Sequence, residues 1–199
     1  MISEQTKDEQ IFEYIITIQP HDDLQERIIR IRKDFNDNFS YDNILPAPHI
    51  LLLKFSQKIS LQDKILRRIR VVAMGWHPFR IDLLNFGCIP CHTIYLEVST
   101  MSGINEFVKH LRSESQNLLR HEEEKPHFIL ESRINIAARL APWQFEKGWL
   151  KYRNINFNAS FIADKITVLR RKAGEKKYFP VHQYPLMNLA AIAQGNLFI

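Results

Sequence analysis

The sequence predicts an α+β protein that contains two antiparallel sheets, with helices on the outside and a central cleft. Strand-like and helix-like segments alternate along the 199 residues, two pairs of strands follow each other without a helix between them, and a short Pro-His motif occurs twice. Neighbouring strands without a crossover helix favour antiparallel pairing over a doubly wound parallel sheet. We therefore expect a single bilobal domain over residues 1–199, in which each lobe carries one histidine strand (48–55 and 126–133).

The first two thirds of the chain read as alternating strands and helices. Residues 11–18 are apolar and rich in β-branched side chains, which is typical of a strand. Asp22 or Asp23 could cap a helix, whose apolar stripe recurs at helical spacing and consists of Leu24, Ile28, Ile31 and Phe35. The further elements are a strand at 49–55, a helix that Ser60 caps and Gly75 ends, a hairpin of strands at 79–86 and 92–98, and a helix at 102–121.

The last third of the chain begins with the second Pro-His copy. That copy opens a strand at 127–133, and a helix follows at 141–152. Three more strands are expected, at 157–162, 165–170 and 178–184, with a basic turn around Gly174 between the last two. The apolar tail at 187–199 is expected to pack against the protein.

The charge balance mildly favours an anionic partner. Lys and Arg exceed Asp and Glu by five (27 − 22), and the isoelectric point is about 9.2. Such a balance suits nucleic acid or a phosphorylated small molecule, although it also simply aids solubility. The sequence contains neither GxGxxG nor GxxxxGK[ST], so no standard nucleotide-phosphate loop is predicted. No apolar run approaches the roughly 20 residues of a membrane span, and no membrane partner is expected.

The two cysteines, Cys88 and Cys91, are expected to be reduced thiols in a turn. One C-x-x-C pair without a second pair is not a zinc pattern, and Pro90 indicates a turn instead of a redox-active helix start. His92 completes the C-x-x-C-H spacing of a haem attachment, which requires export. The chain start at Met1 has no basic and apolar leader, so a cytoplasmic location is predicted.

The most informative feature is a five-residue motif that occurs twice, at 48–52 (Pro-His-Ile-Leu-Leu) and at 126–130 (Pro-His-Phe-Ile-Leu). The two histidines are 78 residues apart (127 − 49), and each opens a strand-like run. Alternate residues of a strand share a face. This groups His49 with Leu51 and Leu53, and His127 with Ile129, Glu131 and Arg133. We expect the two copies to be the inner strands of two similar lobes, with both histidines facing one cleft.

A pair of histidines across a cleft suits phosphodiester chemistry. One imidazole removes a proton from the attacking hydroxyl, and the other protonates the leaving oxygen. An ordinary pKa near 6.5 lets each imidazole take either role near neutral pH. The simpler interpretation is that His49 and His127 are ordinary structural residues of two unrelated strands.

This arrangement resembles the 2H phosphoesterase superfamily, which includes the LigT-like 2'-5' RNA ligases and cyclic phosphodiesterases. The resemblance rests on the two histidine strands, on the order strand, helix, histidine strand, helix, hairpin, helix, histidine strand, and on the closing segment from 161 to 186. It implies a bilobal 2H phosphoesterase-like fold and a hydrolase that acts on nucleotide or RNA phosphodiesters. It also implies His49 and His127 as catalytic residues, with no metal and no organic cofactor.

The chain departs from the family pattern at two positions. The family has Thr or Ser two residues after each histidine, where its hydroxyl holds the phosphate, whereas this chain has Leu51 and Ile129. A hydrogen bond to a charged group contributes roughly 1.5–3 kcal/mol, so two losses could slow turnover by ~10²–10⁴ if nothing compensates. Candidate replacements are cations near the two strands: Arg133, Lys54, Lys125 and Arg139.

The remaining candidates are aromatic residues that could stack on bases. Phe39 and Tyr41 precede the first motif, and Tyr178 and Phe179 follow the basic turn; Tyr41, in polar surroundings, is the preferred substrate contact. The leading hypothesis is a 2H-type phosphoesterase for 2',3'-cyclic or 2'-5'-linked nucleotide or RNA ends. The alternatives are a non-catalytic nucleotide or RNA binder of the same fold, and an unrelated α+β protein.

Overall fold

The structure is a computed structural model that describes residues 9–43, 45–122 and 124–189. Its strands are β1 (Ile11–Ile18), β2 (Ile50–Lys58), β3 (Phe79–Ile89), β4 (Thr93–Val98), β5 (His127–Phe128), β6 (Arg133–Ala138), β7 (Asn158–Ala163), β8 (Lys165–Lys172) and β9 (Phe179–Pro185). Its helices are α2 (Asp22–Phe39), α3 (Gln62–Gly75), α4 (Met101–Leu119) and α5 (Pro142–Tyr152), and a 3₁₀ turn, η1 (Ile59–Leu61), precedes α3. The tail at 187–199 was predicted to pack against the protein, and its residues 190–199 lie outside the described part of the chain.

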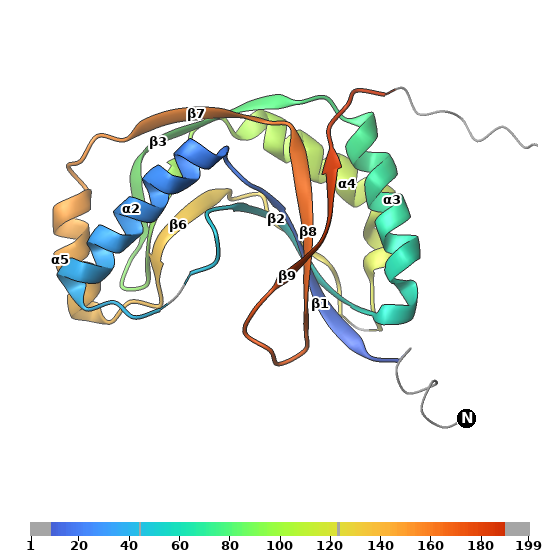
Figure 1. The fold of residues 1–199 in the computed structure, drawn as a ribbon, viewed down its shortest axis with the longest axis horizontal. Coiled ribbons are helices and arrows are strands. Elements are labelled where there is room, and N and C mark those ends of the chain that lie inside the picture. The colour runs from blue at the N-terminus through green and yellow to red at the C-terminus, as the bar shows by residue number, and fades with distance from the viewer. Residues whose placement is uncertain (1–8, 44, 123, 190–199) are drawn as a thin grey trace, which may run out of the picture.

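The strands form two antiparallel sheets, which confirms the predicted α+β class. Sheet A has the order β5-β2-β1-β8-β9, and sheet B has the order β6-β4-β3-β7. Helices α3 and α4 pack against sheet A, while α2 and α5 pack against sheet B. In Figure 1 the two helix pairs lie at opposite ends of the molecule, on the outside, with the sheets between them.

We infer that the two sheets form one domain, because a single hydrophobic core runs through both. Fully buried Ile16 and Ile50 of sheet A belong to the same cluster of packed side chains as Ile81 and Ile134 of sheet B. A continuous core of this kind is what defines one folding unit.

Helix α2 follows its predicted stripe but starts differently. Leu24, Ile28 and Phe35 are buried as expected. The capping residue is His21, whose Nδ1 accepts a hydrogen bond from the Leu24 backbone N–H at 3.2 Å, so the predicted cap at Asp22 or Asp23 is wrong. The two aspartates instead occupy the first turn, where their charge favours the helix dipole.

The second Pro-His copy is not a single strand of a second sheet, contrary to the prediction. His127 lies opposite Lys54 of β2, so β5 belongs to sheet A. The Ile129 backbone N–H then donates to the Leu52 carbonyl at 2.8 Å, and the chain enters sheet B only at Arg133. The physical reason is the open edge of β2, whose backbone groups need partners. Both histidine copies therefore lie side by side on one sheet.

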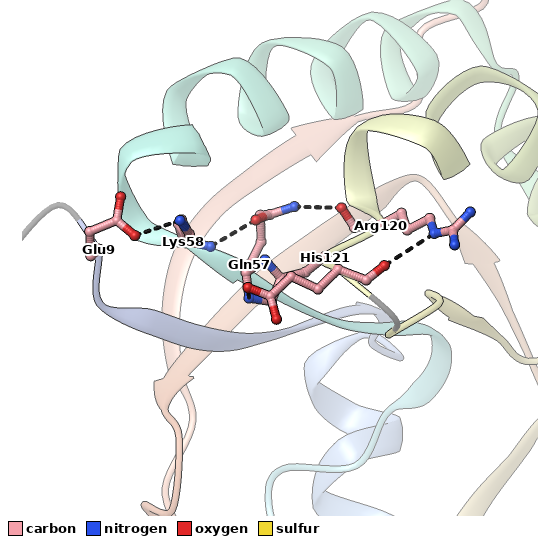
Figure 2. A network of polar contacts seen from close by, with 6 residues as sticks. Glu9, Gln57, Lys58, Arg120 and His121 are labelled. Carbon is pink, nitrogen blue, oxygen red and sulfur yellow. Dashed lines mark hydrogen bonds and ion pairs between the residues drawn. The ribbon is translucent and has the colours of Figure 1, made fainter.

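A polar network holds the connection that leads to the second copy (Figure 2). Buried Gln57, near the end of β2, donates from Nε2 to the Arg120 carbonyl at 3.0 Å and accepts the Lys58 backbone N–H at 2.9 Å. His121 and Glu124 then exchange two backbone hydrogen bonds of 3.1 and 2.8 Å. These contacts fix where the chain leaves α4 and bring the second motif back to β2.

Candidate functional site

Sheet A has one face covered by α3 and α4 and an opposite face, here called the cleft face. Gln57, which bonds to the end of α4, marks the covered face. Lys54 pairs with Ile15 of β1, and Leu51 pairs with Thr17, because an irregularity at Leu52 shifts the β1–β2 register. Ile15 and Thr17 are two residues apart and therefore point to the same face of β1. Since directly paired residues share a face, Lys54, Leu51 and His127 all lie on the cleft face.

A pocket opens where the start of β2 meets the start of β6. Its volume is about 160 Å³. It takes positions 129 and 131 from the connection between β5 and β6, and positions 133 and 135 from β6 itself, where alternate side chains share a face. The complete lining is Arg32, Leu45, Pro46, His49, Leu51, Ile129, Glu131, Arg133 and Asn135.

The pocket brings together most of the residues that the sequence singled out. His49, Leu51, Ile129 and Arg133 all line it. His127 does not line it; its exposed side chain lies on β5, two residues before Ile129. His127 therefore lies outside the pocket that His49 lines, on the same cleft face as Leu51.

His49 is held as a neutral imidazole. Its Nδ1 lies 2.8 Å from the Ala47 carbonyl oxygen, which can only accept, so Nδ1 carries the proton and Nε2 keeps its lone pair. Burial lowers the pKa of His49 and the nearby charge of Arg32 lowers it further, against the opposing effect of the Ala47 hydrogen bond. At neutral pH the pocket thus contains an imidazole nitrogen that can accept a proton.

Arg32, from α2, contributes a half-buried positive charge to the pocket. Its Nε and Nη2 donate to the Asn135 carbonyl at 3.0 and 2.7 Å, and its Nη1 donates to the Pro46 carbonyl at 2.6 Å. Burial lowers its pKa to about 10, which still leaves it charged at neutral pH. No ion pair of Arg32 with a carboxylate occurs within the described residues, and two of its five N–H groups are left to bind an anion.

Arg32 was not among the candidate site residues of the sequence. A usable signal was present. Arg32 is four residues after Ile28 and three before Phe35, so it adjoins the buried stripe of the helix. Spacing alone could have indicated an arginine that reaches inward past the edge of the core.

Arg133 is the second cation of the pocket, and Tyr95 positions it. The Arg133 guanidinium carbon lies 5.4 Å from the centre of the Tyr95 ring, within the range of a cation–π contact. The ring lies so close over Gly87 that a Cβ there would come within 2.5 Å of it. A glycine at 87 therefore leaves room for the ring on which Arg133 rests.

The pocket also contains acceptors. The side-chain oxygen of Asn135 is buried and has no hydrogen-bond donor within the described residues. Glu131 adds an exposed carboxylate at the rim. Two arginines beside acceptors of this kind suit a phosphate ester that carries a neighbouring hydroxyl group.

The structure corrects the expectation for Tyr41. The ring is only 4% exposed, packs edge-on against Phe35, and does not line the pocket. Its hydroxyl donates to the Ala138 carbonyl at 2.8 Å and accepts the Ala138 backbone N–H at 2.9 Å. The polar neighbours in the sequence are explained by this link to β6, so Tyr41 offers no free face for a base.

No group of three or more His, Cys, Asp or Glu side chains within the described residues could hold a metal ion. None of the helices in this part of the chain is long and apolar enough to cross a membrane.

Comparisons with known proteins point to one family. The family model described as the 2'-5' RNA ligase superfamily matches residues 20–175. A comparison with curated protein sequences found no match.

Several solved structures share the fold. TT0787 of Thermus thermophilus matches with a TM-score of 0.65 and 14% identity, covering 88% of this chain and 98% of its own. E. coli LigT complexed with 3'-AMP matches with a TM-score of 0.61 and 16% identity, covering 89% and 98%. A protein described as a phosphoesterase matches with a TM-score of 0.60 and 16% identity, covering 87% and 98%. At these identities the likeness establishes a common fold.

Proposed function

The chain belongs to the 2'-5' RNA ligase superfamily, and we propose that it is a paired-histidine phosphoesterase for 2',3'-cyclic or 2'-5'-linked nucleotide or RNA ends. The observation that carries this proposal is the pocket, in which the neutral imidazole of His49 lies beside two arginines. E. coli LigT has been crystallised with 3'-AMP, ATP and NADP+, which supports a nucleotide as the ligand.

His49 is the general base of the proposed reaction. With Nδ1–H donated to Ala47, the lone pair of Nε2 is free to take a proton from an attacking water. The lowered pKa keeps this nitrogen unprotonated at neutral pH, where a base must be ready.

The two arginines hold the phosphate in the place of the missing motif hydroxyls. Arg32 and Arg133 line the same pocket as Leu51 and Ile129, the residues that replace those hydroxyls. An arginine–phosphate contact is charge-assisted and commonly bidentate, so it is stronger than one neutral hydroxyl contact. The positive charge also stabilises the charge that develops on the phosphoryl oxygens in the transition state.

His127 takes the complementary role of the general acid. For a 2',3'-cyclic phosphate, the water oxygen bonds to phosphorus and its proton passes to His49 Nε2. The bond from phosphorus to one ribose oxygen breaks, and His127 gives that oxygen a proton. The phosphate then lies over Leu51 and Ile129, between the two imidazoles. The side chains named here supply the acid, the base and the positive charge, so we propose a metal-independent reaction.

The test is hydrolysis of a 2',3'-cyclic mononucleotide by the wild type, His49→Ala and His127→Ala. Loss of general acid or base catalysis typically costs 10²–10⁴-fold, and we expect a loss in that range for each variant. His77→Ala is the matched control, because this exposed histidine follows α3 and stacks on Trp76, away from the pocket. Equal rates for all four proteins would reject the catalytic proposal for this substrate.

A second candidate function is nucleotide or RNA binding without turnover. It is favoured by the apolar side chains of Leu51 and Ile129 at the positions where a phosphate would rest. It predicts salt-sensitive binding of a 3'-nucleotide by the wild type, with weaker binding after Arg32→Gln, and no hydrolysis. Measurable turnover that depends on His49 would exclude it.

A further inference from the structure

The outer surface of α3 is basic. Lys64, Arg67 and Arg70 follow one another at three-residue spacing, so they form one row on this helix, and all three are exposed. Buried Ile65 and Ile69 mark the opposite side of the helix, which faces the core. None of the ion pairs within the described residues involves the three cations of the row. Helix α3 contains four Lys or Arg residues and one Asp, a balance of +3 (4 − 1).

An aromatic ring of the β8–β9 hairpin lies beside the start of α3. Phe179 pairs with Arg170, and Arg170 pairs with buried Tyr14 of β1. The Nη1 of Arg170 donates to the side-chain oxygen of Gln62, in the first turn of α3. Because directly paired residues share a face, Phe179 lies on the face of sheet A that α3 covers. Its ring is 52% exposed, and the Lys177 ammonium lies 5.4 Å from the ring centre.

The turn of this hairpin adds further positive charge. Residues 172–177 contain three Lys residues and one Glu, a balance of +2 (3 − 1). Exposed Lys172 pairs with Phe12, two residues before Tyr14, and so lies on the same face as Phe179. The balances of α3 and of this turn together equal the formal charge of +5 of the whole chain.

Exposed apolar side chains accompany these charges. Val71, next to Arg70 on α3, is 60% exposed. After β9 the chain passes the end of α3, where the Leu189 backbone N–H donates to the Met74 carbonyl at 2.9 Å. Met187 and Leu189 are 48% and 47% exposed there. Apolar side chains that gather on one exposed surface indicate an interaction site.

We propose that the surface of α3 and the adjoining β8–β9 hairpin binds the headgroup layer of an anionic lipid bilayer. This surface, here called the α3–β9 face, is defined by Lys64, Arg67, Arg70, Val71, Lys177 and Phe179. Its cations attract anionic headgroups. Its apolar side chains enter the boundary between headgroups and acyl chains, where an aromatic ring with a neighbouring cation is favoured.

The aliphatic side chains favour a bilayer over a nucleic acid as the anionic partner. A single-stranded nucleic acid stacks its bases on aromatic rings, and Val71 and Leu189 offer no ring. The expectation of no membrane partner rested on the lack of a spanning segment, whereas this contact requires only the surface of a bilayer. His127 and Leu51 lie on the cleft face of sheet A, so they point away from the proposed bilayer.

The experiment measures sedimentation of the protein with sucrose-loaded vesicles at low and at high salt. Vesicles of phosphatidylcholine with phosphatidylglycerol should bind the wild type, vesicles of phosphatidylcholine alone should not, and high salt should release the protein. Lys64→Gln/Arg67→Gln should weaken binding roughly 25-fold, at about fivefold for each cation near the surface. Val71→Ser/Phe179→Ser should weaken it by roughly tenfold, because less apolar area leaves water on binding.

Two controls make matched changes at the opposite end of the molecule (Figure 1). Arg30→Gln/Lys33→Gln removes two exposed cations from α2, and Trp143→Ser/Leu150→Ser removes two exposed apolar side chains from α5. Both controls should bind vesicles as the wild type does. The inference is overturned if the wild type does not bind anionic vesicles, if it binds both kinds of vesicle equally, or if the control variants lose as much binding as the variants of the α3–β9 face.

A single-stranded homopolymer RNA tests the other anionic partner. Binding of this RNA that is lost in Lys64→Gln/Arg67→Gln, without binding of vesicles, would also overturn the inference and assign the α3–β9 face to nucleic acid. Vesicle binding requires no turnover, so the result is independent of the hydrolysis assay that tests the proposed function.

Discussion

Restoring the two missing hydroxyls should increase the rate of phosphodiester hydrolysis. Leu51 and Ile129 are half-buried and line the pocket beside His49, so Leu51→Thr/Ile129→Thr places two hydroxyls where the phosphate is proposed to lie. At roughly 1.5–3 kcal/mol per hydrogen bond to a charged group, and 1.36 kcal/mol per tenfold in rate, the upper limit of the gain is about 10²–10⁴-fold. The gain is smaller to the extent that Arg32 and Arg133, which line the same pocket, already supply this stabilisation. Coupling through one phosphate could reduce the gain further.

The substitution should leave the fold intact. The hydrogen bond from the Ile129 backbone N–H to the Leu52 carbonyl does not involve the replaced side chains. Threonine is β-branched and suits position 51 in β2. Since both side chains are only half-buried, the loss of stability should be below the 2–5 kcal/mol typical of large-to-small changes in a core. Thermal unfolding of each variant checks this.

The assay is steady-state hydrolysis of a 2',3'-cyclic mononucleotide. The matched control is Leu51→Val/Ile129→Val, because valine has the branched shape of threonine without its hydroxyl. The reasoning predicts a rate gain for the threonine pair alone. Equal rates for two folded variants, threonine and valine, would refute the claim that hydroxyls at these positions limit the reaction.

Three further predictions concern the surroundings of the pocket. Burial, and to a smaller extent the charge of Arg32, lowers the pKa of His49. Arg32→Gln should therefore raise this pKa and move the acid limb of the pH–rate profile to higher pH, whereas Arg32→Lys should not. An NMR titration of the His49 imidazole in each variant measures the pKa. Tyr41→Phe should destabilise the fold by about 2 kcal/mol in a urea titration without changing nucleotide affinity, because the Ala138 backbone N–H loses its acceptor and the Ala138 carbonyl keeps only the 3.3 Å contact from the Asn43 side-chain amide. Burial alone would raise the pKa of Glu13, but its basic partners, Arg171 and Lys54, lower that pKa below the ordinary value of 4.5. The ionised carboxylate therefore stabilises the fold fully above pH 4.5, and this stabilisation is lost as the pH falls through the folded-state pKa. Glu13→Gln should flatten that part of the curve of unfolding free energy against pH.

Much of the fold could be predicted because its signals are local. The stripe of Leu24, Ile28 and Phe35 identified α2, and the hairpin of β3 and β4 followed from two apolar runs around a turn. The route of the second motif could not be predicted. Whether β5 pairs with β2 or with a strand of the other sheet depends on which edge is open in three dimensions, and periodicity carries no information about that.

The same distinction applies to the site. The alternation that groups Ile129, Glu131 and Arg133 on one face was predicted, and the pocket contains all three. Arg32 was missed, since its partners are carbonyls more than ten residues away in the sequence. Tyr41 was misjudged for a related reason: its hydroxyl bonds to a backbone 97 residues away, which the polar loop around it does not reveal.

The central claim is that His49 and His127 serve one phosphate, although only His49 lines the pocket. The most direct measurement follows the imidazole resonances of both histidines by NMR while a 3'-nucleotide is added, with His77 as internal reference. The account predicts that the signals of His49 and His127 shift together along one saturation curve, and that His77 does not move. A shift of His49 alone, or two curves with different midpoints, would contradict it.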